Sequence, residues 1–185
     1  MDFNDHSKLA GMHAFLSASN YHWVNYDPEK LLRVYGNSEA AKRGTELHAF
    51  AAEAIRLRQR LRGNSSSLAQ YVNDGIGYRM TPEQVLFVSR FCFGTPDTIS
   101  FYGGALRIHD FKSGVSAPAS MMQLRIYAAM FCIEYRLDPR TIEMEFRIYQ
   151  FDETVIEIGD PKEIRDIMEK IRNFTTILEG VEDVA

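Results

Sequence analysis

The segment GTPDTISFYGGALRIHDFKSG, residues 94–114, decides how the rest of the chain is arranged. Its pattern predicts two β-strands joined at Gly103-Gly104, because glycine readily adopts the positive φ that a two-residue hairpin turn requires. If these two glycines form the whole turn, the pairing register is fixed and Asp97 lies opposite Asp110. The sequence therefore predicts a hairpin with two acidic side chains at its open end.

The face of the hairpin that carries both aspartates is predicted to face the core, because its other members are apolar. Lys112 projects from the same face, one step beyond Asp110. Opposed carboxylates repel each other, and partly buried ones cost several kcal/mol unless a partner compensates them. The residues alone leave two partners open: Lys112 in a salt bridge at a solvated hairpin base, or a divalent cation with Lys112 beside it. The apolar members of this face are Ile99, Phe101, Leu106 and Ile108.

The composition is that of a globular chain with enough apolar residues for a core, and 185 residues favour one domain. The net charge of −4 means that a nucleic-acid ligand would need a local basic patch or a bound metal. No apolar run approaches the roughly 20 residues that span a bilayer, and no signal-peptide pattern is seen, so we expect a cytoplasmic protein without a membrane partner. Cys92 and Cys132 lie in apolar sequence, are expected to be buried thiols, and are too few for an iron–sulfur cluster.

A long helix is expected over residues 38–61, after a short helix at 30–35 that Gly36-Asn37 would end. His48 lies among small residues on one side of the long helix. It is either a hydrogen-bonded core histidine or a neutral metal ligand on a helix that lies close over the hairpin. The four arginines at 56, 58, 60 and 62 either complement the helix dipole or form a phosphate-binding edge.

The remaining elements are expected from periodicity. Residues 83–93 are apolar on both faces, which predicts a strand at the centre of the sheet. A buried helix over 118–135 carries Gln123 and Tyr127 one turn apart, either as core residues or as groups that bind a phosphate or a substrate strand. Strands at 141–151 and 155–158 and a helix from 160 to about 178 follow, and a turn of helix is expected at 68–72.

Four short motifs occur along the chain in a fixed order: Gly-x-x-x-His, Gly-x-Pro-Asp, Asp-x-Lys and Gln-x-x-x-Tyr. In this order the chain resembles the PD-(D/E)XK nuclease superfamily, and specifically its RecB-like exonuclease branch, over residues 38–151. The resemblance implies an α/β (α+β) fold with a restriction-endonuclease-like core, in which a central mixed β-sheet is flanked by helices. It implies one nuclease-like domain over residues 1–185, with residues 1–37 and the helix at 160–180 packed on the core.

The resemblance also implies roles for individual residues. Lys112 would orient the attacking water and stabilise charge on the phosphate, acting with Asp97 and Asp110 as the catalytic residues. Gln123 and Tyr127 would lie near the substrate backbone. The implied ligands of a Mg²⁺ or Mn²⁺ ion are His48, Asp97, Asp110 and the backbone carbonyl of Phe111.

The activity expected from the resemblance is that of a Mg²⁺- or Mn²⁺-dependent deoxyribonuclease, with exonuclease action, that hydrolyses phosphodiester bonds in DNA. The alternative is a nuclease-fold module that binds nucleic acid or protein with little or no catalysis. No helicase motif is seen, so a helicase or recombination partner would be a separate chain. Assembly into a homo-oligomer is left open.

Overall fold

The computed structural model describes residues 15–16, 18–63, 65–114 and 120–182. The chain divides into two compact units, residues 1–43 and 44–185. Helix α1 (Pro28–Arg56) runs through the boundary, preceded by the 3-10 helix η2 (Ala18–Asn25). The expected packing of residues 1–37 on the core stays a prediction, and residues 1–14 and 17 lie outside the described part. No helix in the described ranges is both long and apolar enough to cross a membrane.

Helix α1 is continuous from Pro28 to Arg56 and joins the two helices that the sequence predicts. Asp27 Oδ1 accepts a hydrogen bond from the Lys30 backbone N–H at 2.7 Å, which caps the first turn. The prediction that Gly36-Asn37 ends a first helix is wrong, because one glycine inside a helix costs only about 1 kcal/mol relative to alanine and no proline follows it. The helix also ends at Arg56 rather than at 61, because Arg58 takes a left-handed conformation (φ 55°).

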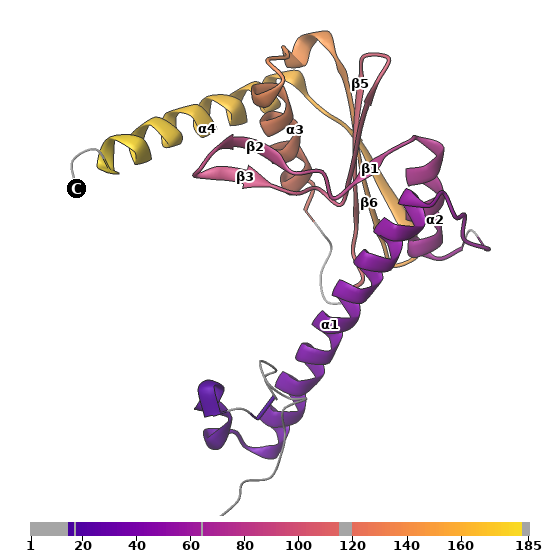
Figure 1. Ribbon diagram of the computed structural model, residues 1–185, viewed down its shortest axis with the longest axis vertical. Coiled ribbons are helices and arrows are strands. Elements are labelled where there is room, and N and C mark those ends of the chain that lie inside the picture. The colour runs from indigo at the N-terminus through magenta and orange to yellow at the C-terminus, as the bar shows by residue number, and fades with distance from the viewer. Residues whose placement is uncertain (1–14, 17, 64, 115–119, 183–185) are drawn as a thin grey trace, which may run out of the picture. The chain divides into compact units, whose positions relative to one another are not determined.

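A five-stranded mixed sheet forms the centre of the second unit, in the order β1-β4-β5-β6-β7 (Figure 1). Strand β5 is its middle strand and pairs antiparallel with β4 and parallel with β6. The parallel pair needs a crossover, which helix α3 (Met122–Glu134) provides. The described part of the chain is thus an α+β fold of four helices, this mixed sheet and a separate hairpin. The strands of the sheet are β1 (Thr81–Pro82), β4 (Thr98–Tyr102), β5 (Ala105–Phe111), β6 (Glu143–Gln150) and β7 (Glu153–Ile158).

The β4–β5 hairpin has the predicted turn and register. Gly103 and Gly104 form the turn with φ values of +61° and +81°, and Tyr102 pairs with Ala105 next to it. The ladder continues to the pair of Thr98 with His109, one pair before Asp97 and Asp110. The register from which the meeting of the two aspartates was predicted is therefore confirmed up to the neighbouring pair.

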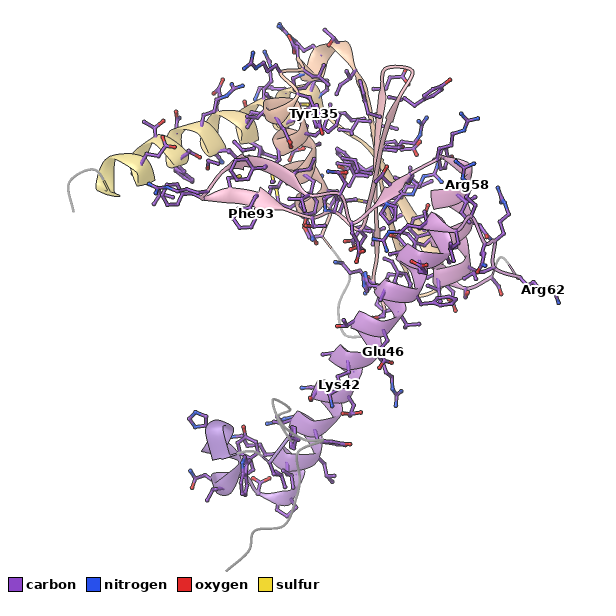
Figure 2. The ribbon with its side chains drawn as sticks, viewed as in Figure 1. Lys42, Glu46, Arg58, Arg62, Phe93 and Tyr135 are labelled. Carbon is purple, nitrogen blue, oxygen red and sulfur yellow. The ribbon has the colours of Figure 1, made fainter. Side chains whose placement is uncertain are left out.

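The prediction of one central strand over residues 83–93 is wrong. The segment forms a hairpin of β2 (Leu86–Ser89) and β3 (Cys92–Gly94), which is a two-stranded sheet of its own. Leu86 is fully buried, whereas Phe87 and Phe93 are 53% and 64% exposed. Figure 2 shows the Phe93 ring on the outside of this hairpin. In this segment, apolar residues on both faces therefore do not indicate a strand that is covered on both sides. The central strand of the main sheet is β5.

Both faces of the main sheet are covered within the second unit. Helix α3, the β2–β3 hairpin and the first half of α4 (Pro161–Glu182) pack on the face of Leu106 and Ile108. Helix α2 (Ser67–Gly77) and the last turns of α1 pack on the opposite face. The second face is polar in sequence, yet His109 on it is fully buried. Cys132 is buried as expected and Cys92 is half-buried.

Candidate active site

Five of the residues singled out from the sequence form two groups of contacts at the open end of the β4–β5 hairpin. His48, on α1, places Nδ1 3.2 Å from Asp97 Oδ2. Lys112, just after β5, donates from Nζ to Asp110 Oδ1 at 3.1 Å and to Gln123 Oε1 at 3.3 Å. The charges of Asp97 and Lys112 both act on Asp110, so the two groups form one electrostatic cluster.

Asp97 lies one residue before β4 and ties the two strands together. Its Oδ2 accepts a hydrogen bond from the Phe111 backbone N–H at 2.9 Å, and the same oxygen meets His48. Its Oδ1 has no hydrogen-bond partner among the described residues. One oxygen of Asp97 thus serves the framework of the site and the other is left for a ligand.

Asp110 is the most deeply buried charged group of the site, with 3% of its surface exposed. Burial and, to a smaller extent, the negative charge of Asp97 raise the pKa of its carboxyl to about 6, against the opposing charges of Lys112 and His48. Asp110 Oδ2 lies 3.0 Å from Lys112 Nζ but outside hydrogen-bond geometry, and no other group among the described residues donates to it. Asp110 is therefore buried although Asp97 and Lys112 beside it are partly exposed, and its carboxylate keeps an unfilled acceptor.

The protonation of His48 is coupled to the same carboxylates. Its hydrogen bond to Asp97 raises the imidazole pKa, burial lowers it, and the charges of Asp97 and Asp110 raise it again. A metal ligand must be the neutral imidazole. A metal at this site would therefore compete with a proton for His48.

The residue types at the site fit Mg²⁺ or Mn²⁺. These ions prefer carboxylate and carbonyl oxygens, and Mn²⁺ also accepts imidazole. The unfilled Oδ2 of Asp110 and the free Oδ1 of Asp97 are suitable donors. In the described residues, however, no three His, Cys, Asp or Glu side chains lie close enough to hold an ion as they stand. Binding would require the His48–Asp97 contact or the Lys112–Asp110 contact to open.

Gln123 and Tyr127 both contact the framework of the site. Gln123 contacts the Lys112 ammonium, and the Tyr127 hydroxyl donates to the Thr95 carbonyl oxygen at 3.0 Å. The Tyr127 ring lies so close to Gly94 that a Cβ there would be 3.0 Å from its Cε1. Helix α3 thus positions both Lys112 and the loop before Asp97. A role for either side chain in substrate binding stays a prediction.

A hollow of about 240 Å³ opens beside His48 and Asp97. Larger hollows of about 370 and 430 Å³ lie between α3 and α4 and beside the tip of the β4–β5 hairpin. The chemistry of the side chains, and not the volume, marks the smaller one as the candidate active site. Its lining residues are His48, Ala52, Tyr71, Glu83, Thr95, Pro96 and Asp97.

Tyr71 is a part of this site that the sequence does not reveal. It comes from α2, is 2% exposed, and stacks on Phe111 with ring centroids 5.7 Å apart. Burial raises its pKa well above the ordinary value, so it stays a neutral hydroxyl. Its only signal in the sequence is its place in the amphipathic helix at 67–77. The sequence predicts only one turn of that helix, at 68–72.

Comparison of the chain with protein-family models, with curated proteins and with solved structures finds no match.

Proposed function

We propose that this chain is a Mg²⁺- or Mn²⁺-dependent deoxyribonuclease of the PD-(D/E)XK type that acts as an exonuclease. The observation that carries the proposal is the group of charged side chains at the open end of the β4–β5 hairpin. Asp97, Asp110 and Lys112 lie there together, and the buried Asp110 keeps an unfilled carboxylate oxygen although an ammonium group is 3.0 Å away. A site built only as a salt bridge would be expected to use both oxygens of so deeply buried an acid.

The order of elements supports a restriction-endonuclease-like core as part of the same proposal. A helix with a histidine is followed, after the second helix α2, by the antiparallel strands β1, β4 and β5, the crossover helix α3 and the parallel strand β6. The β2–β3 hairpin is then an insertion between the first two of these strands. In this arrangement α1 and α3 bring their polar side chains to the same end of β5.

The residues of the site would divide the work of phosphodiester hydrolysis. Asp110, Asp97 and neutral His48 would hold the metal, which when bound lowers the pKa of water and neutralises phosphate oxygens. Lys112 has three N–H donors, of which two are used by Asp110 and Gln123, so one remains for a water or a phosphate oxygen. Gln123 limits where the ammonium can lie, which favours a fixed position for charge stabilisation.

Digestion of end-labelled DNA tests the proposal. Purified protein is incubated with single-stranded, double-stranded and circular DNA in Mg²⁺, in Mn²⁺ and in EDTA. We expect digestion of linear DNA in one or both metals, none in EDTA, and protection of circular DNA. Absence of digestion in both metals on every substrate would contradict the proposal, and digestion of circles would replace exonuclease by endonuclease action.

A second candidate is a nuclease-fold module that binds without catalysis. It is favoured by the direct contacts of His48 with Asp97 and of Lys112 with Asp110, which satisfy part of the site without a metal. DNA binding that is indifferent to EDTA, together with no cleavage in either metal, would select this candidate.

A further inference from the structure

The outer half of the β4–β5 hairpin carries a second hollow, of about 430 Å³, far along the strands from the candidate active site. We name it the arginine–tyrosine hollow. It lies between the C-terminal end of α2 and the hairpin tip. Its lining residues are Gly77, Tyr78, Arg79, Thr81, Ser100, Phe101, Tyr102 and Arg107, so two guanidinium groups and three aromatic rings meet in it without an acidic residue.

The cations and the rings of this hollow are paired. The guanidinium of Arg107 lies 4.9 Å from the centroid of the Tyr78 ring, and that of Arg79 lies 6.0 Å from the centroid of the Tyr102 ring. Tyr102 is 73% exposed. No acidic side chain of the described residues forms an ion pair with Arg79. An exposed ring beside a guanidinium that forms no ion pair with a described acid is a combination that can stack a base and contact its phosphate.

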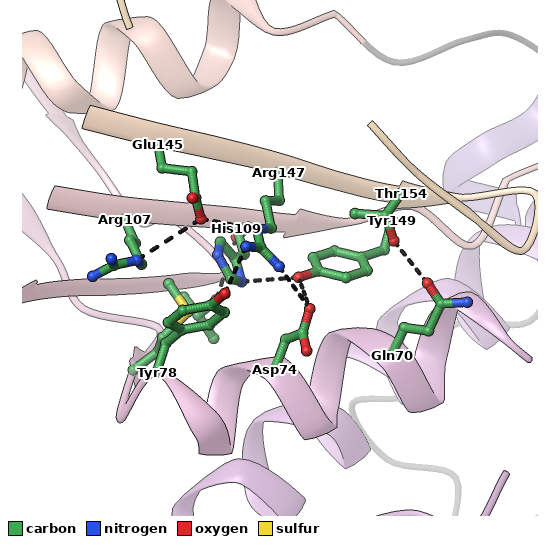
Figure 3. A network of polar contacts seen from close by, with 11 residues as sticks. Gln70, Asp74, Tyr78, Arg107, His109, Glu145, Arg147, Tyr149 and Thr154 are labelled. Carbon is green, nitrogen blue, oxygen red and sulfur yellow. Dashed lines mark hydrogen bonds and ion pairs between the residues drawn. The ribbon is translucent and has the colours of Figure 1, made fainter. Parts of the chain in front are cut away.

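The inner wall of the hollow is formed by a partly buried polar network (Figure 3). Arg147 donates from Nη2 to the Tyr78 hydroxyl at 2.7 Å and from Nη1 to Asp74 Oδ2 at 2.9 Å. The Tyr149 hydroxyl donates to the same Asp74 oxygen at 2.8 Å. Tyr78 is thus fixed between Arg147 and Arg107 before any ligand arrives, which lowers the ordering cost of binding.

Unused hydrogen-bonding capacity remains in this wall. Ser100 and Arg107 pair across β4 and β5, and both Ser100 Oγ and Arg107 Nε are buried without a hydrogen bond. Glu145 forms an ion pair with Arg107, with Oε1 3.8 Å from Nε, which is too long for a hydrogen bond.

The backbone of Arg79 is a further, independent observation. Arg79 follows α2 with φ 52°, and the Met80 N–H closes the helix end on the Gly75 carbonyl at 2.8 Å. Glycine takes this left-handed position without a steric cost, and an arginine does not. Arg58 and Arg136 take the same left-handed conformation, so this position shows that glycine can replace Arg79 without disturbing the fold.

The hollow is connected to the candidate active site through one intermediate hollow, with which it shares Arg79 and Thr81, and through one ion pair. A hollow of about 260 Å³ includes Arg79 together with Arg56 and Arg58. Arg56 forms an ion pair with Glu83, which lines the hollow beside the candidate active site. Figure 2 shows Arg58 standing out from the segment that follows α1. The three hollows therefore follow one another along the edge of the sheet at β1.

We infer that this series of hollows binds single-stranded nucleic acid, with bases against Tyr102 and phosphates on Arg79, Arg107 and Arg58. The choice of nucleic acid as the ligand rests on the proposed function, whereas the binding itself does not require catalysis. Stacking on a protein ring needs an unstacked base, and duplex DNA does not offer one. A single strand on this path would lead from the hairpin tip to the hollow at His48 and Asp97.

Fluorescence anisotropy with a labelled single-stranded oligonucleotide, in EDTA and over a range of salt concentrations, tests this inference. Arg79→Gly removes the guanidinium and relieves the strained backbone, so the variant is expected to fold. Tyr102→Ser changes an exposed side chain. Arg136→Gly is the matched control, because Arg136 has φ 55° at the end of α3 and lines a different hollow.

We expect Arg79→Gly and Tyr102→Ser each to weaken binding by about tenfold, the low end of measured base-stacking effects. Arg79→Gly should also reduce the slope of log K against log salt by about 0.7, the value for one phosphate contact with a single strand. Tyr102→Ser should leave the slope unchanged, and Arg136→Gly should bind as wild type does.

The inference is overturned if wild type does not bind single strands in EDTA, or if Arg79→Gly and Tyr102→Ser bind as tightly as wild type. This outcome is distinct from failure of the proposed function. Tight binding that the two variants weaken, without metal-dependent cleavage, would support the binding surface and contradict the proposed nuclease activity. Metal-dependent cleavage, together with binding that neither variant weakens, would support the nuclease activity and contradict the binding surface.

Discussion

Replacement of Asp110 by asparagine is predicted to change how the stability of the protein depends on pH. The pKa of the Asp110 carboxyl rises from 3.8 to about 6, chiefly because the side chain is buried. The charged form is thus disfavoured in the folded state, so folding is favoured when the carboxyl is protonated. This favourable contribution is fully present below the unfolded pKa and is lost as the pH rises through about 6.

The size of the effect follows from the same shift. A rise in pKa from 3.8 to about 6 corresponds to about 3 kcal/mol of unfolding free energy, lost between about pH 4 and pH 7. Asparagine does not titrate, so Asp110→Asn lacks this loss. Relative to wild type, the variant is expected to gain about 3 kcal/mol of unfolding free energy as the pH is raised over this interval.

Urea denaturation followed by circular dichroism, in metal-free buffers from pH 4 to pH 8, measures this difference. Asp166→Asn is the matched control, because Asp166 is exposed on α4 and its hydrogen bond with Lys162 lowers its pKa. Its stabilising contribution is therefore lost as the pH falls, which is the opposite direction. A difference between Asp110→Asn and wild type that does not change with pH would refute the reasoning about burial.

Three further predictions concern packing, the metal and the position of Lys112. Gly94→Ala should lower the unfolding free energy by about 1–2 kcal/mol in urea denaturation, because the new Cβ would lie 3.0 Å from the Tyr127 ring. Gly36→Ala, with no atom within 4 Å of the new Cβ, should instead raise it by about 1 kcal/mol, and equal changes at both sites would contradict this packing. Mn²⁺ should raise the melting temperature of wild type in differential scanning fluorimetry and leave that of Asp110→Asn unchanged; an equal rise in both would exclude Asp110 as a ligand. Gln123→Ala should lower the rate of DNA cleavage without changing the circular dichroism spectrum, and an unchanged rate would remove its positioning role.

The hairpin could be predicted from the sequence because its information is local. Gly103-Gly104 permits a two-residue turn, and once the turn is known every pair from Tyr102–Ala105 outward follows. The register therefore predicts that Asp97 lies at the end of β5, near Lys112. It did not show that Asp97 uses one oxygen to hold the Phe111 backbone, because that contact depends on how the strand begins.

Other parts of the fold could not be predicted because their signals are ambiguous. Alternating apolar residues at 83–93 suit either one covered strand or a hairpin that exposes Phe87 and Phe93, and only packing against α3 decides between them. Gly36 has the usual sign of a helix end, yet its cost is small beside the hydrogen bonds of the turns around it.

The buried polar face of β5 was missed for a different reason. His109 alternates with apolar residues, as on a solvated strand face, yet α2 covers it and burial lowers its imidazole pKa to about 3. Its neutral ring lies in the same network as Tyr149. Such a network is specified by side chains from three elements and has no periodic signature along the chain.

Cleavage of linear DNA by Lys112→Ala in Mg²⁺ and in Mn²⁺ tests the central claim most directly. Lys162→Ala is the matched control, because Lys162 also pairs with an aspartate but lies exposed on α4. Both variants should keep the circular dichroism spectrum of wild type. The nuclease assignment predicts that Lys162→Ala cleaves DNA as wild type does and that Lys112→Ala does not. Equal cleavage by wild type and Lys112→Ala in both metals would contradict it.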